Sequence, residues 1–215
     1  MIQCNCVRLP DQWTEDCEWL YATASQARRE RADQCRRRED GLRILAAEAL
    51  LRYTLRSQVG TSDFTVKLGS AGKPELVNKP EFCFNLSHSG MWVALAYDTR
   101  PVGVDVERIN PAANMDALSK RLFTAEEQQY IESEDQAKTE RFFRIWTAKE
   151  SYLKFLGTGL TRPLNSFCVL NPEIGVHFRH QVLEGEAVLC ICGEGEIAEP
   201  NEADLDLIRK MEQTQ

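Results

Sequence analysis

Asp105 and Glu107 are the first pair of side chains whose spacing suggests chemistry. They end the alternating segment Val102–Glu107, in which valine occupies every second position. In a strand, residues two apart point to the same face and lie roughly 6.5–7 Å apart, so both carboxylates would share one face while the valines are buried on the other. Two carboxylates at this spacing can share one hard cation with phosphate oxygens and water. Taken alone, the segment is explained more simply as a solvated strand face.

Glu150 and Lys154 form a second pair, four residues apart within an expected helix over residues 140–156. Such a pair is most often a surface ion pair that stabilises a helix by about 0.2–0.5 kcal/mol. Trp146 lies one turn before Glu150 on the same face, and further aromatic and leucine side chains cover the rest of the helix. Because little of this helix remains for solvent, a position facing a cleft is as well supported as a surface position.

His88 is one of three histidines and lies in the segment S-H-S-G (87–90), which is expected to turn between strands over 82–86 and 91–97. Backbone amides and hydroxyl groups in such a turn can bind an anion, and a polar turn without a ligand is an equal alternative. A serine–histidine hydrolase is not favoured, because Ser87 is adjacent to His88 and the pair cannot simply adopt the required geometry.

Six arginines lie within residues 28–38, although the net charge of the chain is −7. Arg28 and Arg31 would share a helix face, and Arg43 could line the same region. A solvated basic face is the usual explanation, and a socket in which guanidinium groups bind phosphate is the alternative. An acidic protein with a local basic patch favours a small polyanionic ligand over nucleic acid or an anionic membrane surface.

The composition, 43% hydrophobic and 27% charged, is that of an ordinary globular protein. Charges interrupt every apolar run well before the roughly 20 residues of a membrane span, and the N-terminal segment does not resemble a signal peptide. We therefore expect a cytoplasmic protein. The eight cysteines form no C-x-x-C motif, which favours free thiols; a zinc site built from the two C-x-C pairs is a less favoured alternative.

The expected elements follow from apolar spacing and from glycine and proline positions. We expect two helices within 25–57, strands at 64–68, 82–86, 91–97, 102–107, 169, 176–178 and 187–192, and helices from the capping box at 124–127, over 140–156 and over 203–211. A turn at 72–74 offers backbone groups to a planar base. This order predicts an α+β protein with two halves that meet near residue 100.

Together these segments resemble the 4′-phosphopantetheinyl transferases, specifically the larger single-chain, surfactin-synthetase-activating type. Four blocks match in order and spacing: G-K-P at 72–74, N-L-S-H-S-G at 85–90, V-G-V-D-V-E at 102–107 and W-T-A-K-E-S-Y-L-K at 146–154. The resemblance implies an α+β pseudo-dimer of two similar halves with the active site in the cleft between them. Residues 1–100 would hold the adenine and 3′-phosphate of coenzyme A, and residues 101–215 would carry the metal site and the carrier-protein side.

The resemblance also implies transfer of 4′-phosphopantetheine from coenzyme A to a serine hydroxyl of an apo acyl or peptidyl carrier protein, with release of 3′,5′-ADP. The implied metal ligands for Mg²⁺, with Mn²⁺ as an alternative, are Asp105, Glu107 and Glu150. The implied contacts of coenzyme A are Arg28, Arg31 and Arg43 for the 3′-phosphate, and Gly72, Lys73 and Pro74 for the adenine. Ser87 and His88 are implied contacts of its phosphates, and Lys154 is the implied partner of the pyrophosphate. Glu150, as the candidate base, and Lys154 are the implied catalytic residues. A metal-dependent phosphoesterase that acts on coenzyme A or a nucleotide without a protein acceptor is the alternative.

The carrier protein would dock on a wall formed by Leu118–Phe123 and the segment after Gly157. Lys120 and Arg121 in that wall suit an acidic carrier. We expect a monomer with no nucleic-acid or membrane partner. A nucleotide- or RNA-binding module is less favoured because the chain is acidic. An inactive structural relative is less favoured because the charged residues of the matching blocks are intact, namely Asp105, Glu107, Glu150 and Lys154.

Overall fold

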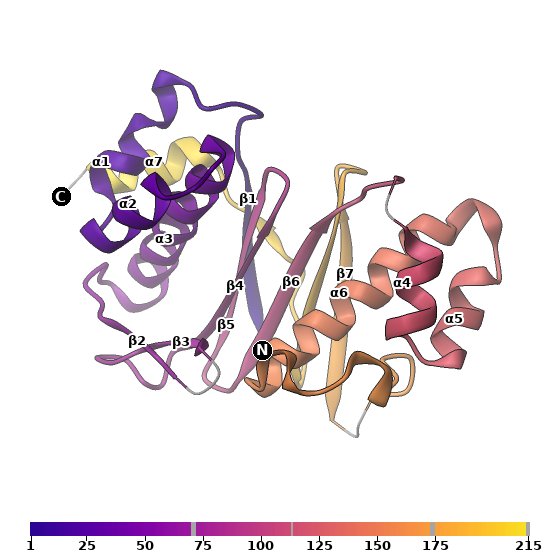
Figure 1. Ribbon diagram of the computed structural model, residues 1–215. Helices are drawn as coiled ribbons and strands as arrows, with labels where there is room; N and C mark the ends of the chain where they lie inside the picture. Colours follow the sequence, from indigo (N-terminus) through magenta and orange to yellow (C-terminus); the bar gives the residue numbers. More distant parts are fainter. Residues whose placement is uncertain (70–71, 113, 173–174, 214–215) are drawn as a thin grey trace.

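Two α+β halves lie side by side, each built on its own sheet with helices against it (Figure 1). The computed structural model describes residues 1–69, 72–112, 114–172 and 175–213. This architecture confirms the predicted α+β pseudo-dimer.

The first half contains a four-stranded sheet in the order β4 (Cys83–Ser89), β5 (Trp92–Asp98), β1 (Gln3–Arg8) and β9 (Asn201–Glu202). The helices of this half are α1 (Glu18–Thr23), α2 (Gln26–Asp33), α3 (Arg38–Val59) and α7 (Leu205–Gln213). A small hairpin of β2 (Val66–Leu68) and β3 (Pro74–Leu76) lies beside them. The last strand and helix come from the far end of the chain, and β9 runs parallel to β1.

The second half contains an antiparallel sheet in the order β6 (Val102–Arg108), β8 (Ala187–Glu194) and β7 (Val176–Leu183). Its helices are α4 (Met115–Leu122), α5 (Ala125–Glu132) and α6 (Lys138–Leu156). Short 3₁₀ turns at Glu15–Cys17, Asp135–Ala137, Gly159–Thr161 and Leu164–Ser166 join elements of both halves.

Helix α6 is the central helix of the second half because apolar residues occupy most of its surface. Phe142, Ile145 and Leu153 are at most 2% exposed. The helix ends at Gly157, whose φ of 66° lies in the left-handed region that glycine adopts readily. The predicted helix over 140–156 is thus confirmed, with two more residues at its start.

A shared apolar core joins the two sheets. The valines of β6 (Val102, Val104 and Val106) are at most 1% exposed and pack in one cluster with Trp92 of β5 and Cys6 of β1. At about 25 cal/mol per Å² of apolar surface buried, such a core is the main stabilising contribution. The acids that alternate with these valines must therefore point the other way, towards β4 and α6.

Several predicted elements differ from the structure. Ser87, His88 and Ser89 belong to strand β4, whereas a turn was expected; the hairpin turn begins at Gly90, whose φ is 57°. Val169 lies in a loop, because its backbone N–H donates to Glu127 Oε1 at 2.8 Å instead of to a strand. Strand β1, helices α1 and α4, and the short strands β3 and β9 were not predicted.

All eight cysteines are free thiols. None of the helices in the described part of the chain is long and apolar enough to cross a membrane. The division at residue 100 stays a prediction: β9 and α7, which follow residue 200, pack with the first half, where Arg52 of α3 pairs with Glu212 of α7 at 2.9 Å.

Candidate active site

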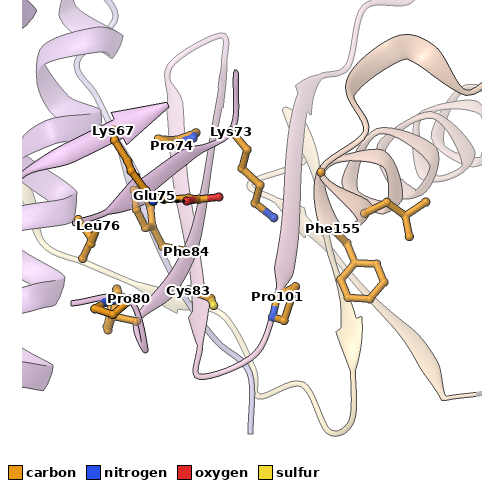
Figure 2. A pocket seen from close by; sticks show the side chains of 13 residues that line it. Lys67, Lys73, Pro74, Glu75, Leu76, Pro80, Cys83, Phe84, Pro101 and Phe155 are labelled. Carbon is orange, nitrogen blue, oxygen red and sulfur yellow. Dashed lines mark ion pairs between the residues drawn. The ribbon is translucent and has the colours of Figure 1, made fainter. Parts of the chain in front are cut away.

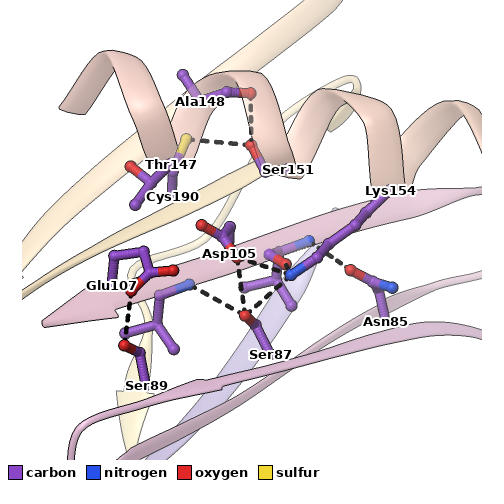
Figure 3. A network of polar contacts seen from close by, with 12 residues as sticks. Asn85, Ser87, Ser89, Asp105, Glu107, Thr147, Ala148, Ser151, Lys154 and Cys190 are labelled. Atoms are coloured by element: carbon purple, nitrogen blue, oxygen red, sulfur yellow. Dashed lines mark hydrogen bonds and ion pairs between the residues drawn. The ribbon is translucent and has the colours of Figure 1, made fainter. Parts of the chain in front are cut away.

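Asp105 lies at the junction of the two halves, where strand β6 faces strand β4 (Figure 3). Its side chain is buried, with 4% of the residue exposed. Its Oδ1 accepts hydrogen bonds from Lys154 Nζ at 2.7 Å and from Ser87 Oγ at 2.9 Å. Lys154 Nζ also donates to Ser87 Oγ and to the carbonyl oxygen of Val104. Strand β4, strand β6 and helix α6 therefore meet at one carboxylate.

Glu107 lies two residues further along the same face of β6 and is half-buried. Its Oε2 accepts a hydrogen bond from Ser89 Oγ at 2.6 Å. Burial raises the pKa of Glu150, and the charges of Asp105 and Glu107 raise it further, so the three carboxylates act on one another. Both carboxylates thus share one face of β6, as the strand spacing predicted, and that face is not the solvated surface that the segment alone favoured.

Gly103 allows helix α6 to lie directly over β6. A side-chain Cβ at this position would collide with the carbonyl oxygen of Ser151 and would lie 2.6 Å from the backbone nitrogen of Phe155. The close approach brings Glu150 and Lys154 to the carboxylates of β6. Gly103 thus leaves room for the helix beside the acids.

A cavity of about 520 Å³ lies between the halves and collects most of the predicted site residues. Its lining includes Arg28, Arg31, Gly72, Pro74, Ser87, His88, Asp105, Glu107, Glu150 and Lys154. Apolar side chains of α3, the β2–β3 hairpin, β4 and α6 complete the walls: Ile44, Ala47, Val66, Leu68, Leu86 and Trp146. A cavity of this size that is lined by basic groups, acids and apolar side chains suits a ligand that carries phosphates and an apolar part.

Lys73 and Arg43 are not among the residues that line this cavity. Lys73 Nζ instead donates to the carbonyl oxygens of Val102 at 2.9 Å and Lys154 at 2.6 Å. Figure 2 shows this side chain reaching from the β2–β3 hairpin towards β6, along a second cavity of about 410 Å³. Its ammonium group therefore ties the hairpin to the second half.

Arg43 Nη1 donates to the carbonyl oxygen of Gly90 at 2.6 Å, and the guanidinium group also pairs with Asp40. Arg43 still acts on the predicted site through its charge. The pKa of His88 is lowered by partial desolvation at the cavity wall and then by the positive charge of Arg43. A neutral imidazole would bind phosphate through an N–H group without adding charge.

Burial sets the protonation behaviour of the acids. It raises the pKa of Asp105, and the ammonium of Lys154 partly opposes this effect. Burial also raises the pKa of Glu107, against the hydrogen bond from Ser89. For Glu150, burial and then the charge of Asp105 raise the pKa. Each of the three carboxyl groups thus has a raised pKa. A cation added among them would strongly stabilise their ionised forms.

The residues fit a divalent cation in one further respect. Asp105 Oδ2 is buried and has no hydrogen-bond partner among the described residues. A buried polar atom without a partner costs about 1–3 kcal/mol, and more when charged, so this oxygen is suited to a metal ligand. No three acidic, histidine or cysteine side chains in the described ranges form a ready-made metal cluster. The arrangement therefore suits a hard cation that takes further oxygen ligands from phosphate and water.

Sequence reasoning missed Ser89 and the apolar residues that line the cavity, of which Trp146 is one. Ser89, which holds Glu107, was placed in a turn. Trp146 was placed on the correct helix face but was not assigned to the site, although it lines the cavity. The i−4 spacing from Trp146 to Glu150 was the signal that could have identified it.

Comparisons with known proteins agree with the geometry. Residues 11–100 match the family described as 4′-phosphopantetheinyl transferase, N-terminal, and residues 101–198 match the 4′-phosphopantetheinyl transferase superfamily. The chain is 36% identical over 146 residues to 4′-phosphopantetheinyl transferase Sfp of Bacillus subtilis (strain 168), covering 65% of this chain and 64% of that protein. It is 32% identical to 4′-phosphopantetheinyl transferase ffp of Bacillus subtilis, covering 75% and 72%, and 35% identical to HetI of Nostoc sp., covering 72% and 69%.

The matched regions span about two thirds of the length of these relatives. Two α+β halves lie around a cleft whose three acids and lysine suit a phosphate-bearing ligand. The chain belongs to the 4′-phosphopantetheinyl transferase superfamily.

Proposed function

We propose that this protein transfers 4′-phosphopantetheine from coenzyme A to a serine hydroxyl of an apo acyl or peptidyl carrier protein and releases 3′,5′-ADP. The observation that carries the proposal is the cleft in which Asp105, Glu107, Glu150 and Lys154 line one cavity together with two arginines. Carboxylates that can hold a cation and basic side chains that can bind phosphate are the two requirements for binding a pyrophosphate and stabilising the charge on it.

Arg28 and Arg31 lie on α2 and line the same side of the cavity, where they would bind the 3′-phosphate of coenzyme A. Arg43 would support them through its charge near His88. Gly72 and Pro74 offer the wall for the adenine. For Lys73, its bonds to two backbone carbonyls support a role in holding this wall in place.

Lys154 and the acids would act on the pyrophosphate. Asp105, Glu107 and Glu150 would hold Mg²⁺, or Mn²⁺, and the bound cation would supply Lewis-acid stabilisation of charge on the phosphate oxygens. Lys154 Nζ lies beside Asp105 and Ser87, from which it would donate to the phosphate and stabilise the departing 3′,5′-ADP. Ser87 and His88 would orient the phosphates from strand β4.

Glu150 is the proposed base that accepts the proton of the carrier serine, directly or through a water. A base works best when its pKa lies near the working pH, and burial raises the pKa of Glu150 in that direction. Glu150 is half-buried and lines the cavity, so an incoming hydroxyl could reach its carboxylate from there. The serine oxygen would attack phosphorus as the bond to the ADP oxygen breaks.

The proposed carrier surface consists of α4 and the segment after Gly157. Asn165 Nδ2 donates to the carbonyl oxygen of Arg121, which joins the two parts of this wall. Lys120 and Arg121 are exposed and would face an acidic carrier. Phe123 was expected in this wall, but only 3% of it is exposed because it packs against Phe142, so it cannot contact a carrier directly.

The test combines the protein, coenzyme A and Mg²⁺ with a panel of apo carrier domains and follows the intact carrier mass. We expect a gain of one phosphopantetheine group that EDTA and Asp105→Ala abolish. The matched control is Asp206→Ala, an exposed acid on α7 in the first half, which should transfer at the wild-type rate. Charge reversal at Lys120 and Arg121 should raise the KM for the carrier and leave the KM for coenzyme A unchanged.

Coenzyme A that is cleaved at the same rate with and without carriers would instead establish the phosphoesterase alternative. Absence of both transfer and cleavage across the panel, with coenzyme A still bound, would contradict the proposed function.

A further inference from the structure

Three alternate side chains of β4 bond to the backbone of β6. Strand β6 pairs with β8 along one edge, so its other edge presents N–H groups that need acceptors. The acceptors are Asn85 Oδ1 for Val104 N–H at 2.9 Å, Ser87 Oγ for Val106 N–H at 3.3 Å and Ser89 Oγ for Arg108 N–H at 3.1 Å. We call these three contacts the side-chain ladder.

The two serines of the ladder make a second contact each. Ser87 Oγ donates to Asp105, and Ser89 Oγ donates to Glu107 (Figure 3). Each serine thus accepts from a backbone N–H of β6 and donates to the carboxylate of the preceding residue. The third rung differs, because Asn85 faces Gly103, which has no side chain to hold.

We propose that Ser89 is a positioning residue that fixes the Glu107 carboxylate in the orientation needed to bind the divalent cation. This inference rests on the proposed function. The contact of 2.6 Å is short and charge-assisted, as expected for a hydroxyl donating to a carboxylate. Ser89 Oγ also accepts from the backbone N–H of Arg108, the residue after Glu107. The hydroxyl group therefore cannot move with a rotating Glu107 carboxylate, and it holds that carboxylate in place relative to the backbone of β6.

Ser87 cannot be separated from catalysis in this way. Its hydroxyl also receives a hydrogen bond from Lys154, and it lines the cavity. Ser89 does not line the cavity, so its effect on metal binding must pass through Glu107. Removal of an outer partner of a metal ligand typically lowers metal affinity 10–100-fold.

The experiment measures Mn²⁺ binding directly, by the loss of the free-Mn²⁺ electron paramagnetic resonance signal, with coenzyme A present and no carrier. We expect Ser89→Ala to raise the Mn²⁺ Kd about tenfold and to raise the Mg²⁺ concentration for half-maximal transfer by a similar factor, with kcat at saturating Mg²⁺ within about twofold of wild type. Ser89→Thr keeps the hydroxyl and should restore most of the affinity.

Asn85→Ala is the matched control, because it removes a rung that holds a backbone N–H and no carboxylate. It should change the Mn²⁺ Kd less than twofold even where it lowers Tm as much as Ser89→Ala does. In a Glu107→Ala background, Ser89→Ala should have no further effect on the Kd.

The outcomes separate the two proposals. If wild-type protein binds Mn²⁺ and transfers phosphopantetheine while Ser89→Ala keeps the wild-type Kd, the positioning inference is wrong and the proposed function stands. An equal loss of affinity in Asn85→Ala and Ser89→Ala would also overturn it, as would a further loss in the Glu107→Ala background. If wild-type protein neither binds Mn²⁺ nor transfers, the proposed function fails as well.

Discussion

Replacing Lys149 with methionine should destabilise this protein far more than replacing a surface lysine would. Lys149 precedes Glu150 on α6, yet its side chain is fully buried. Its Nζ pairs with Glu127 at 2.8 Å and donates to the carbonyl oxygens of Leu164 at 2.8 Å and Phe167 at 2.7 Å. One ammonium group thus ties α6 to α5 and to the segment that follows Gly157.

The magnitude follows from what methionine leaves behind. Glu127 is also fully buried, and its carboxylate cannot turn to water because it accepts from the backbone N–H groups of Thr124 and Val169. Breaking a buried pair by removing one partner costs about 3–5 kcal/mol. At roughly 2–4 °C per kcal/mol for a chain of this size, Tm should fall on the order of 10 °C.

Urea and thermal unfolding of four proteins would test this: wild type, Lys149→Met, Glu127→Gln and the double variant. The double variant should be more stable than Lys149→Met, because the neutral glutamine removes the unpaired buried charge. Lys138→Met is the control, since Lys138 pairs with exposed Asp116 and Glu132 and should cost less than about 1 kcal/mol. A loss in Lys149→Met no larger than in Lys138→Met would refute the reasoning.

Four further predictions concern other contacts. Burial lowers the pKa of His180 to about 4 from its ordinary 6.5, so the unfolded chain binds this proton more readily than the folded protein. The free energy of unfolding should therefore be fully present above about pH 6.5 and should fall by at most about 3 kcal/mol as pH falls towards 4. In urea unfolding, the stability difference between wild type and His180→Gln should shrink over that window. Lys73→Met should lower the free energy of unfolding by about 2 kcal/mol and raise the KM for coenzyme A more than it lowers kcat, whereas the exposed Lys67→Met should do neither. Gly103→Ala should lower stability by about 1–3 kcal/mol and reduce kcat, because α6 must move away from β6; wild-type values of both would contradict the close approach. Arg31→Ala should raise the KM for coenzyme A about tenfold and leave the KM for 3′-dephospho-coenzyme A unchanged, and an equal rise for both substrates would show that Arg31 does not bind the 3′-phosphate.

Much of the fold was predictable because its elements carry local signals. The capping box at Thr124 and Glu127 marked the start of α5 and is present in the structure, and Gly157 marked the end of α6. Strand β1 was missed although Cys4, Asn5 and Cys6 alternate in polarity, and the structure buries all three of them. Its position beside β5 depends on pairing over some ninety residues, which no local pattern records.

The site was predictable in its membership and less so in its connections. The cavity brings together most of the residues that the resemblance implied. An ion pair between Glu150 and Lys154 was expected within α6, but Lys154 makes its shortest contact with Asp105 of β6. Helical spacing shows which residues share a face, and it does not show which residue of another element comes closer.

The segment S-H-S-G illustrates why polarity alone misled the prediction. Serines at alternate positions suggest a solvated turn, but here both hydroxyls are acceptors for the free edge of β6 and donors to its acids. Each hydrogen bond of the side-chain ladder joins residues 19 positions apart. The offset is constant because β4 and β6 run in the same direction. Polar residues at every second position therefore allow a second interpretation besides a solvated turn. They can form a strand whose side chains supply the hydrogen bonds that a neighbouring strand would otherwise supply to an unpaired edge. In this protein the replacement has a chemical consequence, because a side-chain partner, unlike a backbone partner, can satisfy the strand and orient its acids with the same atom.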